Sequence, residues 1–135
     1  MNGVYESMAD VRLAVLILTY NEERNIEECL QSASFADEII IIDSYSEDQT
    51  VKLAEKYGTR VVQNEMKSFA AQRNFAMAQT RADWVFFLDA DERVTPEAAE
   101  EIVGIVQKNE RIMWRVKRRN ILFGQRMRFG GHRPD

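Results

Sequence analysis

Two aspartates separated by one residue, Asp89 and Asp91, are the side chains of this sequence whose type and spacing most directly suggest chemistry. They follow the apolar run 84–88, whose length and composition predict a buried strand. Alternate side chains of a strand point to the same side, so both carboxylates face one pocket if the turn keeps this direction. A divalent cation held there, Mg²⁺ or Mn²⁺, can neutralise a diphosphate as it leaves a substrate. The alternative is a simple turn, because Asp-x-Asp is frequent by chance and aspartate often follows a strand.

A second polar cluster, 43–48, follows the apolar run 38–42. The Asp43 carboxylate can accept a hydrogen bond from a nucleobase N–H or a ribose hydroxyl, and nearby serine hydroxyls can adapt around that ligand. The alternative is that Ser46 or Asp48 caps the helix that follows. Both interpretations can hold, with different residues serving each.

A third cluster, Thr19-Tyr20-Asn21-Glu22, follows the apolar run 13–18. It offers backbone amides, a hydroxyl group and an aromatic face beside a helix start, which suits stacking on a base. The alternative is that Thr19 or Asn21 caps the helix.

Arg73 is a fourth candidate, near the start of a predicted helix over 68–79. Its guanidinium group can pair with a strand-end carboxylate or with a phosphate. The alternative is an ordinary exposed cation on a helix.

The elements that position these clusters alternate along the chain. Strands are predicted over 13–18, 38–42, 60–63, 84–88 and 112–117, and helices around 26–33, 53–57, 68–79 and 95–106. This alternation indicates an α/β fold, a Rossmann-like, mostly parallel sheet with helices on both faces, because parallel neighbours need crossover connections. The three polar clusters then share one rim at the carboxyl ends of the strands, where such sheets bind ligands.

Two of the predicted helices have a clear apolar side. In the helix over 68–79, the side chains expected to be buried are Ala71, Phe75 and Ala78. The segment Thr95-Pro96-Glu97 is a helix start, with an oxygen at the N-cap and proline at the first helical position. The buried stripe expected in that helix comprises Ala98, Ile102, Ile105 and Val106.

Taken in this order, the clusters resemble the nucleotide-binding half of an inverting family 2 glycosyltransferase with the GT-A fold. The stretches that carry the resemblance are 15–22, 42–50, Ala71-Gln72-Arg73-Asn74 and 87–92. The chain is most similar to the bacterial lipopolysaccharide inner-core glucosyltransferases, which also show Gly-Gly-x-x-Pro-Asp, here at 130–135.

The resemblance implies a UDP-sugar donor, Mg²⁺ or Mn²⁺, and transfer of a hexose to a lipopolysaccharide or another glycan acceptor, including a lipid-linked one. It places Thr19, Tyr20 and Glu22 in the uridine pocket and Asp43 on the uracil or ribose. It places Arg73 against the base-side carboxylates, Asp89 at the ribose or the metal's shell, and Asp91 as the main metal ligand.

The resemblance also implies a general base that the sequence does not supply. In this family a carboxylate from the second half of the domain takes the proton of the acceptor hydroxyl, and a base must lie within hydrogen-bond reach of that proton. The final residue, Asp135, is a poor candidate. We therefore expect a truncated domain that binds the nucleotide without efficient transfer.

Two other classes use similar residues. A haloacid-dehalogenase-type phosphatase would use Asp89 as its nucleophile, but such enzymes usually carry Thr or Val where this chain has Arg93. A non-catalytic, magnesium-binding domain of the receiver type would need a facing lysine after a late strand, and none stands in the expected place.

Length predicts one domain, over 12–118, after a loose leader over 1–11 and before a basic, glycine-containing tail over 119–135 that opens a missing acceptor-side region. The net charge of −4 is uneven: residues 111–135 hold 8 Lys and Arg against 1 acidic residue. This end is either a solvated basic face or a surface for phosphates or an anionic membrane. We expect no nucleic-acid partner.

The single cysteine, Cys29, cannot form an internal disulfide and falls on the apolar side of its helix, so we expect it in the core. Together with the lack of a signal peptide or a run of roughly 20 apolar residues, this predicts a cytoplasmic protein. Peripheral contact with the inner face of the membrane is a further expectation.

Overall fold

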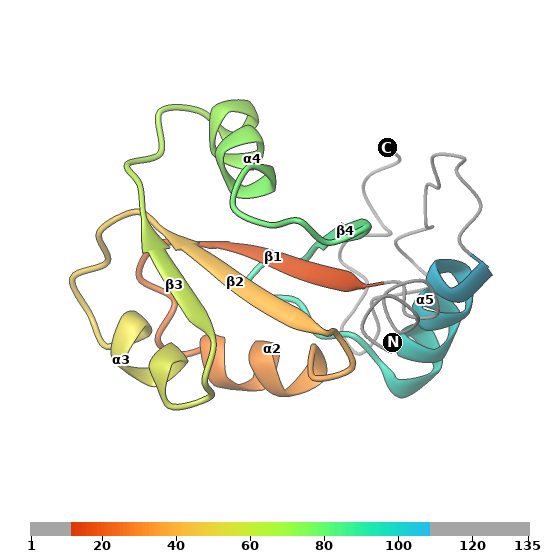
Figure 1. The fold of residues 1–135 in the computed structure, drawn as a ribbon. Helices are drawn as coiled ribbons and strands as arrows, with labels where there is room; N and C mark the ends of the chain where they lie inside the picture. Colours follow the sequence, from red (N-terminus) through yellow and green to blue (C-terminus); the bar gives the residue numbers. More distant parts are fainter. Residues whose placement is uncertain (1–11, 109–135) are drawn as a thin grey trace, which may run out of the picture.

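The computed structural model describes residues 12–108, in which strands and helices alternate (Figure 1). The strands are β1 (Leu13–Thr19), β2 (Glu38–Asp43), β3 (Arg60–Gln63) and β4 (Trp84–Phe87). The helices are α2 (Ile26–Ser32), α3 (Thr50–Glu55), α4 (Phe69–Met77) and α5 (Pro96–Lys108). The predicted leader, the predicted strand over 112–117 and the basic tail lie outside the described residues. No helix in the described part is long and apolar enough to cross a membrane.

The four strands form one sheet in the order β3-β2-β1-β4, and every neighbouring pair is parallel. β1 has a partner on each side, which explains why its sequence is an unbroken apolar run. Its last residue, Thr19, is in register with Asp43 at the end of β2. The predicted parallel α/β sheet is confirmed, and its register brings two of the polar clusters side by side.

Helices cover both faces of the sheet, as predicted. Figure 1 shows α4 on one face, with α2 and α3 on the other. Leu13, Val15 and Ile17 of β1 pack with α2 and α5, whereas Ala14 and Leu16 pack with Ala76 of α4. The alternation follows from the strand period of two.

The predicted buried side of α4 is right for Phe75, which is partly buried against the core, and wrong for Ala71 and Ala78. Ala71 and Ala78 are exposed, while Gln72 and Ala76 are buried. Gln72 can enter the interior because its amide group pairs with Asn64: its Nε2 donates to the Asn64 carbonyl at 2.7 Å, and its Oε1 accepts from Asn64 Nδ2 at 2.8 Å. A satisfied amide costs little to bury, and hydrophobic spacing gives no sign of such a pair.

The start of α5 is as predicted. Thr95 Oγ1 accepts a hydrogen bond from the Ala98 amide at 3.1 Å, and Pro96 is the first helical residue. The buried stripe holds Ala98, Ile102 and Val106, while Ile105 is only partly buried.

Two glycines give a stability test with opposite signs. Gly58 follows α3 with φ of +72°, and a Cβ atom there would meet no atom within 4 Å, so Gly58→Ala adds only backbone strain. We expect this change to lower the free energy of unfolding by about 1–2 kcal/mol. Gly104 lies inside α5, where a Cβ atom would also meet no atom within 4 Å. Because alanine favours the helix more than glycine does, Gly104→Ala should raise the free energy of unfolding by up to about 1 kcal/mol. Urea unfolding measures both, and shifts of the same sign would contradict the assigned backbone conformations.

Candidate functional site

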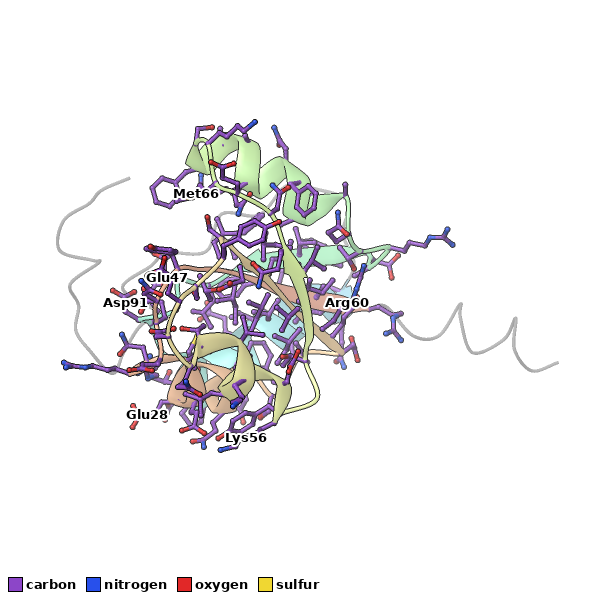
Figure 2. The ribbon with its side chains drawn as sticks, turned by 90° about the vertical axis from the view of Figure 1, so that its left-hand side faces the viewer. Glu28, Glu47, Lys56, Arg60, Met66 and Asp91 are labelled. Carbon is purple, nitrogen blue, oxygen red and sulfur yellow. The ribbon has the colours of Figure 1, made fainter. Side chains whose placement is uncertain are left out.

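The carboxyl ends of the strands form one rim. Besides the pairing of Thr19 with Asp43, the Leu88 amide donates to the Leu16 carbonyl at 3.1 Å, which carries the chain after β4 alongside β1. Figure 2 shows Glu47, Met66 and Asp91 on one side of the molecule, opposite Arg60 at the amino end of β3. The loops that follow the strands therefore lie together, as expected from the parallel order.

Asp43 is a fully buried carboxylate within this rim. Its Oδ1 accepts hydrogen bonds from Thr19 Oγ1 at 2.6 Å and Ser46 Oγ at 2.7 Å, and its Oδ2 accepts from the Ser46 amide at 2.8 Å. A buried charge is tolerated only with such donors. In this arrangement Asp43 joins the β1 and β2 ends, and direct contact of its carboxylate with a base or ribose stays a prediction.

The loop after β1 (20–25) is joined to the loop after β2 (44–49) and to Thr50, the first residue of α3, by hydrogen bonds between side chains and backbone amides. Three backbone amides of the β1 loop are donors. The amide of Asn21 donates to Ser46 Oγ at 2.7 Å, that of Glu22 to Thr50 Oγ1 at 2.8 Å, and that of Glu23 to Asp48 Oδ2 at 3.2 Å. In return, Glu47 donates to Asn21 Oδ1 at 2.8 Å and Gln49 to Glu23 Oε1 at 3.0 Å. Each loop thus satisfies polar groups of the other, which fixes their relative position.

The helix-capping alternatives are wrong for Thr19, Asn21 and Ser46. Asp48 is not the N-cap residue of α3, but its Oδ1 accepts a hydrogen bond from the amide of Thr50, the first residue of that helix, at 2.9 Å. The N-cap of α2 is Asn25 and that of α3 is Gln49, and neither makes a side-chain cap hydrogen bond. Thr19, Asn21 and Ser46 bond across the two loops instead. Asn21 adopts φ of +52°, a left-handed conformation that asparagine tolerates, and this turns the chain away from a cap.

Two tyrosine side chains project from the joined loops. Tyr20 is 52% exposed and Tyr45 is 60% exposed. Tyr45 has φ of +54°, which is unfavourable for a bulky residue, and its amide is held by Gln63 Oε1 at 2.8 Å. The rim therefore carries exposed aromatic surface, and stacking of Tyr20 on a base stays a prediction.

The hydrogen bonds of Asp48 favour its negatively charged form. Desolvation by itself raises its pKa, but hydrogen bonds from the Thr50 hydroxyl and amide and from the Glu23 amide outweigh it, so the pKa lies below its ordinary value. A lowered carboxylate pKa stabilises the fold above the ordinary pKa of aspartate, and this contribution is lost as pH falls through the lowered value.

Asp89 and Asp91 both lie exposed beyond the end of β4. The Glu92 amide donates to the Asp89 carbonyl at 2.9 Å, and the buried Glu92 side chain accepts from the Asp89 amide at 2.9 Å. The turn predicted as an alternative is present, but it leaves both aspartate side chains on the surface. Turn and ligand-binding roles are thus compatible.

Sequence reasoning missed the residues that hold this turn. Arg93 donates to the carbonyls of Ala90 and Glu92 and to side-chain oxygens of Asn25 and Glu28, all between 3.0 and 3.3 Å. Ala90 and Glu92 are close to Arg93 in the sequence, whereas Glu28 and Asn25 lie 65 and 68 residues before it. The only sign of these contacts in the sequence is that a charged pair, Glu92 and Arg93, directly follows the two aspartates.

Arg73 lies over an aromatic ring. Its Cζ is 5.8 Å from the centre of the Phe87 ring, a cation–π contact at the end of β4. The expected pairing with base-side carboxylates is absent from the contacts of Arg73 within residues 12–108, which leaves the ring as its anchor. Arg73 nevertheless lies near the rim, since Phe87 precedes Asp89 by two residues.

Within the described residues no group of three or more His, Cys, Asp or Glu side chains is arranged to hold a metal ion. Asp89 and Asp91 supply two exposed carboxylates on one turn. This donor set fits Mg²⁺ or Mn²⁺, since such ions are often held by one or two carboxylates with substrate phosphates and water completing the shell. It does not fit a metal bound by protein ligands alone.

A cavity of about 500 Å³ lies at the other edge of the sheet. Its lining includes Asp37, Glu38 and Ile39 at the start of β2, and Tyr57, Gly58 and Thr59 before β3. None of the predicted site residues lines it, so the rim, and not this cavity, collects the candidate chemistry.

Cys29 lies beneath the Asp89 turn. It is fully buried in α2, as predicted, and its Sγ is 3.5 Å from the Asp89 carbonyl oxygen. Burial raises the pKa of its thiol to about 12; Arg93 opposes this change, and the nearby carboxylates reinforce it. The thiol therefore stays protonated and supports the turn as a weak donor.

The chain belongs to Glycosyl transferase family 2, which it matches over residues 14–130. It is 33% identical over 118 residues to the lipopolysaccharide core biosynthesis glycosyltransferase LpsC of Rhizobium meliloti, covering 83% of this chain and 44% of that protein. Family membership and sheet topology leave no support for the phosphatase and receiver-type alternatives.

Solved structures show the same fold. The crystal structure of Staphylococcus aureus TarS 1–349 matches with a TM-score of 0.64 and 28% identity, over 73% of this chain and 33% of that one. Mycobacterium tuberculosis glucosyl-3-phosphoglycerate synthase, in complex with Mn²⁺, UDP-glucose and phosphoglyceric acid, matches with a TM-score of 0.61 and 25% identity, over 78% and 42%. The predicted GT-A fold is confirmed. The chain spans less than half the length of the curated relatives it matches.

The buried Asp43 gives a direct test of how the rim is held. In Asp43→Asn one acceptor becomes an NH₂ group facing a donor, so we expect a loss of about 1–3 kcal/mol in the free energy of unfolding. The matched control is Glu47→Gln, an exposed acid in the same loop, which should change stability little. If Asp43→Asn and wild type had the same free energy of unfolding in urea, the loops would not depend on Asp43.

Cys29 should be inert to alkylation in the folded protein. At pH 8, iodoacetamide should label it only after urea unfolding, because the folded thiol is buried and protonated. The unfolded thiol loses its proton near pH 9 and the folded one near 12, so stability falls with rising pH between these values. At pH 10, wild type should therefore have lost about 1 kcal/mol more of its free energy of unfolding than Cys29→Ala, relative to pH 8. Equal pH dependence would contradict the raised pKa.

Proposed function

We propose that this chain is the donor-binding part of a glycosyltransferase that binds a UDP-sugar with Mg²⁺ or Mn²⁺ and transfers its hexose to a glycan acceptor. The observation that carries the proposal is the rim itself: the β1 and β2 loops are hydrogen-bonded into one unit, next to the exposed carboxylates of Asp89 and Asp91. Two similar proteins support the nucleotide and metal, since TarS is known in complex with UDP and the mycobacterial synthase with Mn²⁺ and UDP-glucose.

The base side of the site is assigned to the two joined loops. Tyr20 offers its exposed ring to the uracil, and Glu22 lies half-buried beside it. Thr19 and Asp43 are both buried and bonded to each other, so their contribution is to hold this surface in place. The hydroxyl groups of the ribose would then contact atoms of the two loops, whose position Thr19 and Asp43 fix.

The phosphate side is assigned to the turn after β4. Asp91 would be the main metal ligand and Asp89 would contact the ribose or complete the metal's shell. A bound divalent cation would supply charge neutralisation for the departing diphosphate. Arg73, held over Phe87, keeps a positive charge near the same end of the sheet.

The acceptor is assigned from the relatives and the sequence. LpsC acts in lipopolysaccharide core biosynthesis, which supports a lipopolysaccharide or another lipid-linked glycan. The basic residues 111–135, which lie outside the described part, would suit contact with anionic lipid at the membrane surface. The general base of the transfer step is unassigned among residues 12–108.

Titration calorimetry with UDP tests the assignment. We expect UDP to bind in the presence of Mn²⁺, to bind at least tenfold more weakly in EDTA, and to lose the metal-dependent part in Asp91→Ala. Glu97→Gln, an exposed acid in the first turn of α5, is the matched control and should bind as wild type does. Absence of a binding signal for UDP at millimolar concentration, with or without metal, would overturn the proposal.

A further inference from the structure

Arg93 lies two residues after Asp91 and holds the turn from its inner side. Its side chain is 21% exposed, and its Nη1 donates to the carbonyls of Ala90 at 3.3 Å and Glu92 at 3.0 Å. Both carbonyls belong to the turn that carries the two aspartates. The guanidinium group therefore fixes the backbone of this turn and leaves the aspartate side chains exposed.

The same guanidinium group also reaches the segment that follows β1. Its Nη2 donates to Asn25 Oδ1 at 3.3 Å, and its Nε donates to Glu28 Oε1 at 3.2 Å. The other amide atom of Asn25, Nδ2, donates to Glu22 Oε1 at 3.0 Å. One line of hydrogen bonds thus runs from Glu22 through Asn25 and Arg93 to the carbonyl of Ala90.

We propose that Arg93 is a positioning residue that sets the Asp89-Ala90-Asp91 turn at a fixed distance from the β1 loop. The inference rests on the proposed function, in which these two segments hold opposite ends of one UDP-sugar. A diphosphate has a set length, so affinity depends on how well the two ends of its site keep their separation.

The geometry favours a role in position over a role in bulk charge. Arginine presents five N–H donors in a rigid plane, and here they are shared among two carbonyls, an amide oxygen and a carboxylate. Lysine would keep the charge but could not span these acceptors from one side chain. Replacement by lysine therefore separates the two roles.

The experiment compares Arg93→Lys and Arg93→Gln with a matched control, Lys56→Gln. Lys56 also makes a surface ion pair, with Glu27 at 3.4 Å, but it lies in the segment after α3 and away from the turn. By calorimetry, both Arg93 variants should bind UDP with Mn²⁺ about tenfold more weakly than wild type. Metal-free uridine should bind to them as it does to wild type, and Lys56→Gln should leave both affinities unchanged. Wild-type affinity of Arg93→Lys for UDP with Mn²⁺ would overturn the inference.

Hydrogen exchange gives a second readout that needs no ligand. The amides of Asp89 and Val94 are bonded to Glu92 Oε1 and Ser32 Oγ, and both should exchange faster in the Arg93 variants while β1 and β2 amides stay protected. Unchanged exchange at Asp89 and Val94 would overturn the inference even if UDP binding changed. If wild type bound no UDP, the proposed function would fail, while exchange would still decide whether Arg93 holds the turn.

A milder variant covers the case in which Arg93 substitutions unfold the chain. Asn25→Ser removes the link from Arg93 to Glu22 and leaves the contacts of Arg93 with the turn in place. We expect weaker binding of UDP with Mn²⁺ and little change in exchange at Asp89. Unchanged binding would show that the two segments are not coupled through Asn25.

Discussion

A carboxylate buried between two strand ends is the constraint on which the rim depends. Parallel pairing in register puts Asp43 next to Thr19, where water cannot reach it. A buried carboxyl group in that place needs hydrogen-bond donors, and these come from Thr19 and from both the amide and the hydroxyl of Ser46. Once Asp43 has drawn Thr19 and Ser46 together, the amides after β1 meet the side chains after β2, and the two loops become one surface.

The elements of the fold follow from local patterns, which is why they could be predicted. β3 has the predicted bounds, because its four residues lie between a glycine turn and a polar loop, and α5 begins where Thr95 and Pro96 place it. A parallel order then requires the polar clusters to share an edge. Choosing the buried face of α4 required more than spacing, because the interior position of Gln72 depends on Asn64, a partner in another segment.

The site was predicted less well than the fold, for a related reason. Capping is a short-range interaction, so Thr19, Asn21 and Ser46 were natural candidates for the helices that follow them. In the folded chain they serve a neighbouring loop more than 20 residues away, because the loops lie side by side and offer better partners. Arg93 and its partner Asn25 are 68 residues apart, a separation at which no periodicity or motif carries information.

Burial divides the polar groups of the rim into two sets with different physical consequences. Buried Asp43 and Glu92 already accept hydrogen bonds from the protein, so a ligand that sought them would first have to break those bonds. Tyr20, Asp89 and Asp91 are exposed at the surface, so a ligand can reach their side chains without unfolding the rim. Under the proposed function, selectivity for the nucleotide would reside in the exposed set, and the affinity would depend on how rigidly the buried set holds those groups apart. A change to a buried acid should for this reason disturb the fold and binding together, and a change to an exposed one should affect binding alone.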